Sequence, residues 1–272
     1  MSEFEFQRFI TIGQYIPTDS TVHQLDPRTR LIAGGLLLIA ITATPHLLGI
    51  IVGLMALVLL LALARLPLRY VGKGLLAPLP FILFLVLLQV LLGAPAAQDP
   101  WVVVGPVRIS EASILSAVKI LLRFPALILT ITLLSATTAT TEAVRGLDAL
   151  LQPLTTLGLP IQDFVLMVQV ALRFLPLLAR EAERIAKSQA SRGADWGTGR
   201  RGLLRRARQA LPILVPLFLV SLERAETLAL AMEARAYRGQ AKRTSMIKLR
   251  FRSSDALSVL VTTALAAAIL LI

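Results

Sequence analysis

The chain has 272 residues, of which 56% are hydrophobic, and it carries a formal net charge of +12. This apolar share exceeds the roughly 45–50% of soluble domains, so an ordinary water-soluble globular protein is excluded. The absence of cysteine excludes disulfides and thiolate metal sites. No cluster of His, Asp or Glu surrounds either histidine, His23 or His46, so we expect loop or interfacial residues rather than metal ligands.

The first apolar region predicts a helical hairpin. Leu31–Thr44 and Leu47–Ala64 are apolar, and Pro45 and His46 separate them. A single helix over these 34 residues would be about 50 Å long, beyond the ~30 Å core of a bilayer. Basic residues flank both outer ends of the hairpin, which places those ends on the cytoplasmic side. They are Arg28 and Arg30 before the first span, and Arg65, Arg69 and Lys73 in the loop after the second.

Two further spans follow. The third covers Leu75–Leu92, with an irregular first turn because it begins with Pro78 and Pro80. The segment Gly93–Val107 lacks Lys and Arg and predicts an external loop.

The fourth helix, Ser110–Ser135, contains Lys119 and Arg123. A charge that faces lipid costs a few kcal/mol or more, so we expect both side chains to face the helix bundle or a wet surface.

The next hundred residues are strongly basic. Between Arg180 and Arg252 lie 17 of the 28 Lys and Arg residues but 6 of the 16 acids. Such a region stands in water, on the cytoplasmic side. We expect a short helix over Glu142–Leu157 and two long helices over Ile161–Gln189 and Leu203–Ala236. Their apolar parts are too short to cross a bilayer, so both lie under or partly in the membrane.

A last span over Asp255–Ile272 completes the expected architecture. The fold class is all-α, a polytopic membrane protein with about five transmembrane helices and two long cytoplasmic coupling helices. The N-terminus is then cytoplasmic and the C-terminus external. The expected divisions are residues 1–141 with four spans, residues 142–252 as the coupling-helix region, and residues 253–272 as the last span.

Catalytic motifs are missing from the sequence. It has no Walker-type phosphate loop, no HExxH motif and no Ser/His/Asp arrangement, so we predict neither an enzyme nor a cofactor bound by this chain. Gly197–Gly202 is glycine-rich but lacks the preceding strand and the lysine of such a loop, which favours a basic turn.

Three short motifs remain. Asp26 can cap the first span, with Pro27 in its first turn. Ser191-Arg192-Gly193 and Ala234-Arg235-Ala236 each place an arginine at the end of a long helix. Gly193 suits the left-handed position after a helix, and Arg192 complements the negative end of the helix dipole. Because this arrangement occurs twice, it favours arginine forks that bind carboxylates of a partner.

These motifs together resemble the transmembrane (T) component of energy-coupling factor transporters. The resemblance lies in Gly13–Pro17, His23–Thr29, Leu172–Gly193 and Ala231–Gly239, and extends over nearly the whole chain. The N-terminal part resembles the group whose T component is shared among several substrate-binding subunits.

The resemblance implies a scaffold subunit of a prokaryotic ATP-driven importer of vitamins or other micronutrients, in the cell membrane. Its partners would be two ABC-type ATPases, which bind ATP and Mg, and a small substrate-binding membrane subunit that selects the substrate. The implied ATPase-docking residues are Ser191, Arg192, Gly193, Ala234, Arg235 and Ala236. The implied structural or coupling residues are Asp26, Pro27, Arg28, Arg173, Pro176 and Glu181.

Two positions depart from the family pattern. Ser191 replaces an alanine, and Ala236 replaces a glycine. The added methyl group of Ala236 disfavours a left-handed backbone, which makes Arg238 and Gly239 a secondary docking candidate.

Two other classes stay open. A self-contained secondary transporter needs a polar site at the membrane midplane, for which Lys119, Arg123 and Gln89 are candidates. A membrane-tethered binder of nucleic acid or anionic lipid rests on charge alone. Because aromatic residues are not interleaved with the basic ones, we expect no nucleic acid as a partner.

Overall fold

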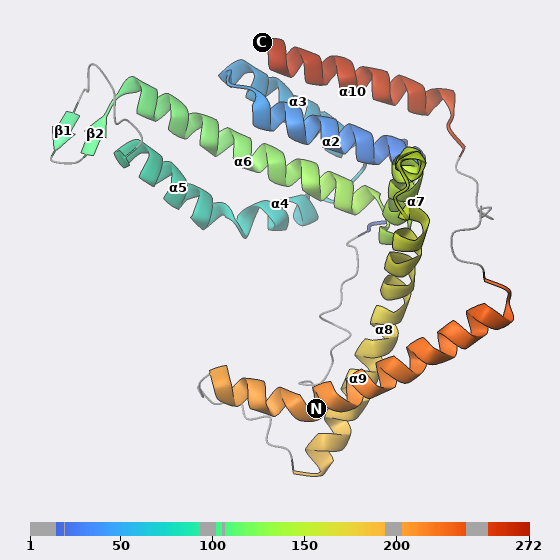
Figure 1. Cartoon of the computed structure of the whole chain (residues 1–272). Helices are drawn as coiled ribbons and strands as arrows, with labels where there is room; N and C mark the ends of the chain where they lie inside the picture. Colours follow the sequence, from blue (N-terminus) through green and yellow to red (C-terminus); the bar gives the residue numbers. More distant parts are fainter. Residues whose placement is uncertain (1–14, 19, 93–101, 105–106, 194–202, 238–249) are drawn as a thin grey trace. The chain divides into compact units, whose positions relative to one another are not determined.

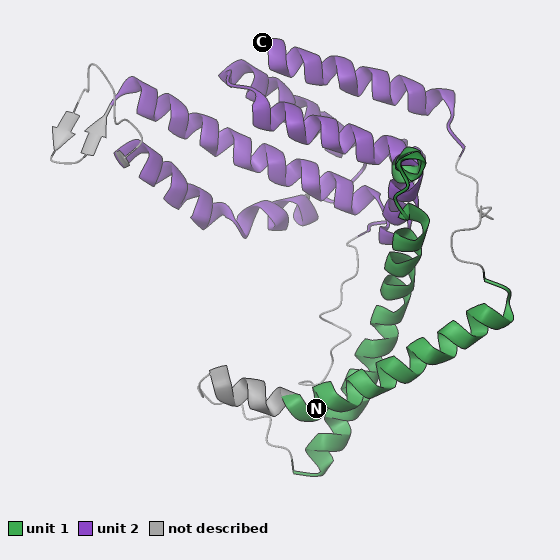
Figure 2. Ribbon diagram, in the orientation of Figure 1, with its two compact units in different colours: residues 1–12, 151–246 green, residues 13–150, 247–272 purple. Residues whose placement is uncertain are grey.

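The computed structural model describes all residues except 1–14, 19, 93–101, 105–106, 194–202 and 238–249. Contacts divide the chain into two compact units (Figure 2). We call residues 13–150 with 247–272 the bundle unit, and residues 1–12 with 151–246 the crossed-helix unit. The expected division into residues 1–141, 142–252 and 253–272 stays a prediction.

The bundle unit begins with the predicted hairpin. Helix α2 covers Pro27–Ala43 and α3 covers Leu47–Leu63. Thr44 follows α2 with an extended backbone, and Pro45 cannot donate the hydrogen bond that would continue the helix. The expected turn at Pro45 and His46 is confirmed.

The third span differs from the expectation. Helices α4 (Leu68–Leu76) and α5 (Leu79–Leu92) are bent by 47° at a short break that contains Pro78. The irregular start is confirmed, but Arg69 and Lys73 lie on α4 and not in a loop. The reason is that the apolar residues of this segment support a helix before the proline.

A small hairpin interrupts the segment expected to be a loop. Strands β1 (Val102–Val104) and β2 (Val107–Ile109) pair antiparallel, with Val103 opposite Arg108. Helix α6 (Glu111–Thr137) follows, and the Ser110 hydroxyl caps it by accepting a hydrogen bond from the Ser113 N–H at 3.2 Å. The fourth predicted helix is confirmed to within two residues at its end.

The last helix, α10 (Ser253–Leu271), returns to pack against α2 and α3, and α6 packs against both α2 and α3 (Figure 1). Glycines of α3 permit the close approach of α10: a Cβ on Gly49 would collide with the Ile269 carbonyl oxygen. Ile41 and Ile269 are fully buried in this core. The first and last spans of the chain therefore form one packed body.

The remaining helices follow α6 in the sequence. Helix α7 covers Thr140–Leu151 and continues into a 3₁₀ turn, η1 (Gln152–Leu157), which ends at Gly158 with φ of 80°. In the crossed-helix unit, α8 covers Ile161–Ser191 and α9 covers Leu203–Ala234. Both long helices are confirmed.

The all-α membrane fold is confirmed, with the small hairpin as an addition. Within the described residues, three helices are long and apolar enough to cross a membrane, or four if α4 and α5 form one broken span. Five were expected; α2 and α3 have 17 residues each, fewer than the about 20 that a transmembrane helix needs. Helix α8 is one of the three, which corrects the expectation that its apolar part is too short to cross.

Candidate functional site

The two long helices of the crossed-helix unit touch at polar contacts. Arg224 of α9 forms an ion pair with Glu181 of α8, with 3.5 Å between Nη2 and Oε2. Nearer the end of α9, the Tyr237 hydroxyl donates a hydrogen bond to Asp163 Oδ1 at 3.3 Å. Figure 1 shows α8 and α9 crossing. Glu181, a predicted coupling residue, therefore links the two helices.

The first arginine triplet ends α8. The Arg192 N–H donates to the Gln189 carbonyl at 3.1 Å, and the Gly193 N–H donates to the Ala190 carbonyl at 3.0 Å. Gly193 has φ of 83°, which confirms the predicted left-handed position. All three residues of the triplet are exposed, so the Arg192 side chain projects from a closed helix end.

The second triplet ends α9 with a complete Schellman motif. The Tyr237 N–H donates to the Met232 carbonyl at 3.0 Å, and the Ala236 N–H donates to the Glu233 carbonyl at 2.8 Å. Ala236 takes the left-handed position with φ of 57°. The methyl group disfavours this conformation, but Ala236 adopts it, and the two hydrogen bonds hold it there. Arg235 is exposed.

The structure keeps the two arginines apart. Arg192 follows the last residue of α8, whereas Arg235 lies two residues before Tyr237, which contacts Asp163 in the first turn of α8. The 31 residues of α8 span about 45 Å. The arginines thus lie toward opposite ends of α8, and each can meet a different molecule.

Apolar side chains cover much of both helices. On α9 an exposed stripe repeats every three or four residues, as on one face of a helix; it consists of Leu211, Leu214, Val215, Phe218, Leu219 and Leu222. On α8, Phe164, Met167 and Leu175 are exposed. The predicted coupling residues Arg173 and Pro176 are also exposed on α8. These faces are suited to lipid or to another membrane subunit.

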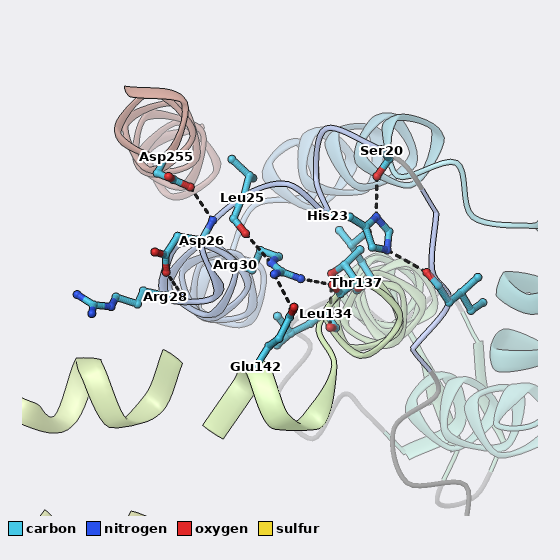
Figure 3. A network of polar contacts seen from close by, with 12 residues as sticks. Ser20, His23, Leu25, Asp26, Arg28, Arg30, Leu134, Thr137, Glu142 and Asp255 are labelled. Atoms are coloured by element: carbon cyan, nitrogen blue, oxygen red, sulfur yellow. Dashed lines mark hydrogen bonds and ion pairs between the residues drawn. The ribbon is translucent and has the colours of Figure 1, made fainter. Parts of the chain in front are cut away.

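The bundle unit holds a separate polar network at the N-terminal end of α2 (Figure 3). Asp26 caps α2 by accepting from the Arg28 N–H at 3.0 Å, as predicted, with Pro27 in the first turn. The Asp26 N–H donates to Asp255 Oδ1 at 2.8 Å, and Asp255 Oδ2 accepts from the Arg252 N–H at 2.8 Å. Asp255 is 1% exposed. This carboxylate therefore joins the starts of α2 and α10.

Arg30 is the second centre of this network (Figure 3). Its guanidinium donates to the Leu25 carbonyl at 3.1 Å, to the Thr137 carbonyl, and to Glu142 Oε2 at 2.8 Å. Arg30 is buried, and Glu142 is partly exposed. The side chain ties α2 to the end of α6 and to the first turn of α7, and it is thereby fixed in one conformation.

Comparison with known proteins identifies the family. A family model described as CbiQ, cobalt transport protein, matches residues 18–246. The chain belongs to the CbiQ family. It is 39% identical over 246 residues to the energy-coupling factor transporter transmembrane protein EcfT of Heliobacterium modesticaldum, covering 90% of this chain and 91% of that protein. The EcfT proteins of Acidaminococcus fermentans (39% over 259 residues, 94% of each chain) and Bacillus subtilis (38% over 265 residues, 95% of this chain and 96% of that protein) are similar.

This CbiQ-family chain is therefore a transmembrane component of energy-coupling factor transporters. The sequence-based resemblance to that family is confirmed. The secondary docking candidates Arg238 and Gly239, the start of the N-terminal motif, and the basic turn Gly197–Gly202 lie outside the described residues.

Sequence reasoning missed the partners in the polar network. In the sequence, Arg30 indicated only which end of the first span is cytoplasmic, and Glu142 marked only the start of a short helix. Their separation of 112 positions leaves no local pattern that would pair them. Arg123, by contrast, behaves as expected: it donates to the Thr44 carbonyl at the tip of the α2–α3 hairpin and so faces the bundle. Lys119 is half-buried.

Proposed function

We propose that this chain is the scaffold subunit that couples ATP hydrolysis by two partner ATPases to micronutrient uptake through a separate substrate-binding membrane subunit. The observation that carries the proposal is the pair of exposed arginines, Arg192 and Arg235, which end two crossed helices toward opposite ends of α8. One arginine then docks on each ATPase. ATP and Mg bind to the ATPases, and this chain is not itself an enzyme.

The form of the helix ends supports docking. Both ends close their backbone hydrogen bonds with a left-handed residue, so each arginine leaves a rigid cap. A guanidinium can form two parallel hydrogen bonds with a carboxylate in a groove of a partner. The small neighbours Ser191, Ala234 and Ala236 leave room for such a groove to close around the side chain.

The apolar faces of α8 and α9 support the second partner. Their exposed stripes offer a surface for the substrate-binding subunit or for lipid, while the charged parts of the same helices face the ATPases. When the ATPases close on ATP, the two arginine ends move relative to each other, and the crossed helices transmit that motion to the substrate-binding subunit. In this arrangement the N-terminus and the charged parts of the coupling helices are cytoplasmic and the C-terminus is external.

Charge reversal at the two arginines tests the docking. Arg192→Glu and Arg235→Glu each weaken co-purification of the ATPases, and the double variant abolishes it together with ATP-driven uptake. Arg184→Glu is the matched control, because Arg184 is an exposed arginine of α8 outside the triplet. Normal assembly and uptake by the double variant would overturn the docking proposal.

The secondary-transporter alternative has its own test. The half-buried Lys119 and the inward-facing Arg123 are the observations that favour it. Vesicles that contain this chain alone, without the ATPases, should show no uptake. Gradient-driven uptake in such vesicles would favour the alternative.

A further inference from the structure

The bundle unit contains a half-open cavity that the proposed function does not use. It has a volume of about 420 Å³ and is lined by α2, α6 and α10, with contributions from α3 and from the segment before α2. This volume lies within the ~300–1,000 Å³ range of small-ligand sites. All lining residues belong to the bundle unit.

The polarity of the cavity is graded along its length. Gln24, Arg30, Arg252 and Ser254 line the end at the start of α2 and α10. Farther along the helices the lining becomes apolar, with residues such as Leu37, Leu133 and Val261. The cavity is therefore amphipathic, with a polar mouth and an apolar interior.

The two threonine hydroxyls that α6 contributes to the lining do not alter this polarity. Thr130 donates to the Ala126 carbonyl at 2.8 Å, and Thr137 donates to the Leu133 carbonyl at 2.7 Å. Because each proton is used within its own helix, these threonines have no free donor for a ligand. A polar solute would find few hydrogen-bond partners there, whereas a hydrocarbon chain needs none.

One side of the cavity opens along α10. Leu257 and Val261 line it and are also 63% and 55% exposed. The lining of α10 runs from Ser254 to Thr262, which corresponds to about 12 Å of helix. An extended chain can enter through this side from the surrounding bilayer. A helix about 10 Å wide would fit for only about one turn in this volume.

The polar mouth favours an anion. Arg30 is already paired with Glu142, but Arg252 is exposed and forms no ion pair with a described residue. Asp255 Oδ2 already accepts the N–H at the start of α10, so the Arg252 side chain is the cation that the mouth offers. The charge at the mouth is complementary to a phosphate group.

We propose that this cavity binds one acyl chain of an anionic phospholipid, whose phosphate lies at the Arg252 side chain. The site is distinct from the crossed helices and from the two arginine triplets. A bound lipid would fill the space between α6 and α10 and hold α10 in place.

Native mass spectrometry of the full-length protein in detergent tests the proposal, with phosphatidylglycerol and phosphatidylcholine of identical chains. We expect one tightly retained phosphatidylglycerol, with at least fivefold preference over phosphatidylcholine. Arg252→Gln reduces phosphatidylglycerol affinity about fivefold and leaves phosphatidylcholine unchanged. Ser258→Trp fills the cavity from α10 and removes retention of both lipids.

Matched variants control for folding and for charge. Arg250→Gln removes an exposed arginine two residues away, and Leu260→Trp adds the same ring on the outer side of α10; neither residue lines the cavity. Both should retain the lipid as the unmodified protein does. Thermal unfolding of all four variants in lipid-free detergent should be unchanged. Equal binding of the two lipids, or full retention by Ser258→Trp, would overturn the proposal.

Discussion

The two units of the chain differ in how many of their side chains are buried. The bundle unit contains nearly all the buried residues, including the fully buried Ile41 and Ile269. In the crossed-helix unit, the buried residues among those described are Val165, Ala179 and Ala186, all on α8. The bundle unit therefore has a core of its own, although it also exposes apolar side chains such as Met55 and Phe81. Helices α8 and α9 bury few side chains, so their apolar faces depend on other molecules for cover.

Their polar groups differ in the same way. In the bundle unit, Arg30 and Asp255 are buried and are held by several hydrogen bonds. In the crossed-helix unit, Arg192 and Arg235 are exposed at helix ends. Substitutions of these buried groups should thus act on stability, and those of the two exposed arginines on assembly.

Arg30→Ala should have the largest effect on stability. It leaves the carbonyls of Leu25 and Thr137 without their donor and Glu142 without its ion pair, at a cost of about 3 kcal/mol. Arg28→Ala is the matched control, because the Arg28 side chain is half-buried and its Nε has no partner. Thermal unfolding in detergent measures both. Similar losses in the two variants would contradict the role given to Arg30.

Gly49→Ala should come next. The added Cβ collides with the Ile269 carbonyl oxygen and lies 2.7 Å from Thr44 Oγ1, so α3 and α10 must separate. Such overpacking costs about 2 kcal/mol. Gly35→Ala, where no atom lies within 4 Å of the new Cβ, is the control and should be neutral or slightly stabilising. The same unfolding measurement separates them, and equal effects would show that α10 does not pack on Gly49.

Ala236→Gly should have the smallest effect and the opposite sign. Glycine adopts the left-handed backbone of this position without strain, which stabilises the end of α9 by about 1 kcal/mol. Ala234→Gly should destabilise the same helix end by a similar amount, because Ala234 is its last helical residue. Hydrogen exchange of the amides at 235–237 reports the difference. If both glycines loosen this end, Ala236 is not strained.

Local sequence signals predicted much of the fold. The turn at Pro45, the cap by Asp26 and the left-handed Gly193 each depend on a few adjacent residues, and each was predicted correctly. The two arginine triplets were also visible as helix ends. Their role stays a proposal, because docking depends on molecules outside this chain.

Local patterns left two other features open. A break at Pro78 separates α4 from α5. Composition alone placed this proline at the start of a span and did not predict the helix before it. The left-handed conformation of Ala236 contradicts its intrinsic preference, and two backbone hydrogen bonds hold it in place.

The sequence by itself determined the membrane class, the long basic helices and their caps, because hydropathy, charge and capping act over a few residues. Only the tertiary structure decided that Arg30 meets Glu142, that Asp26 meets Asp255, and that an amphipathic cavity lies between α6 and α10. These partners are 112 and 229 positions apart. Such pairings follow from the packing of whole helices, which no local pattern encodes.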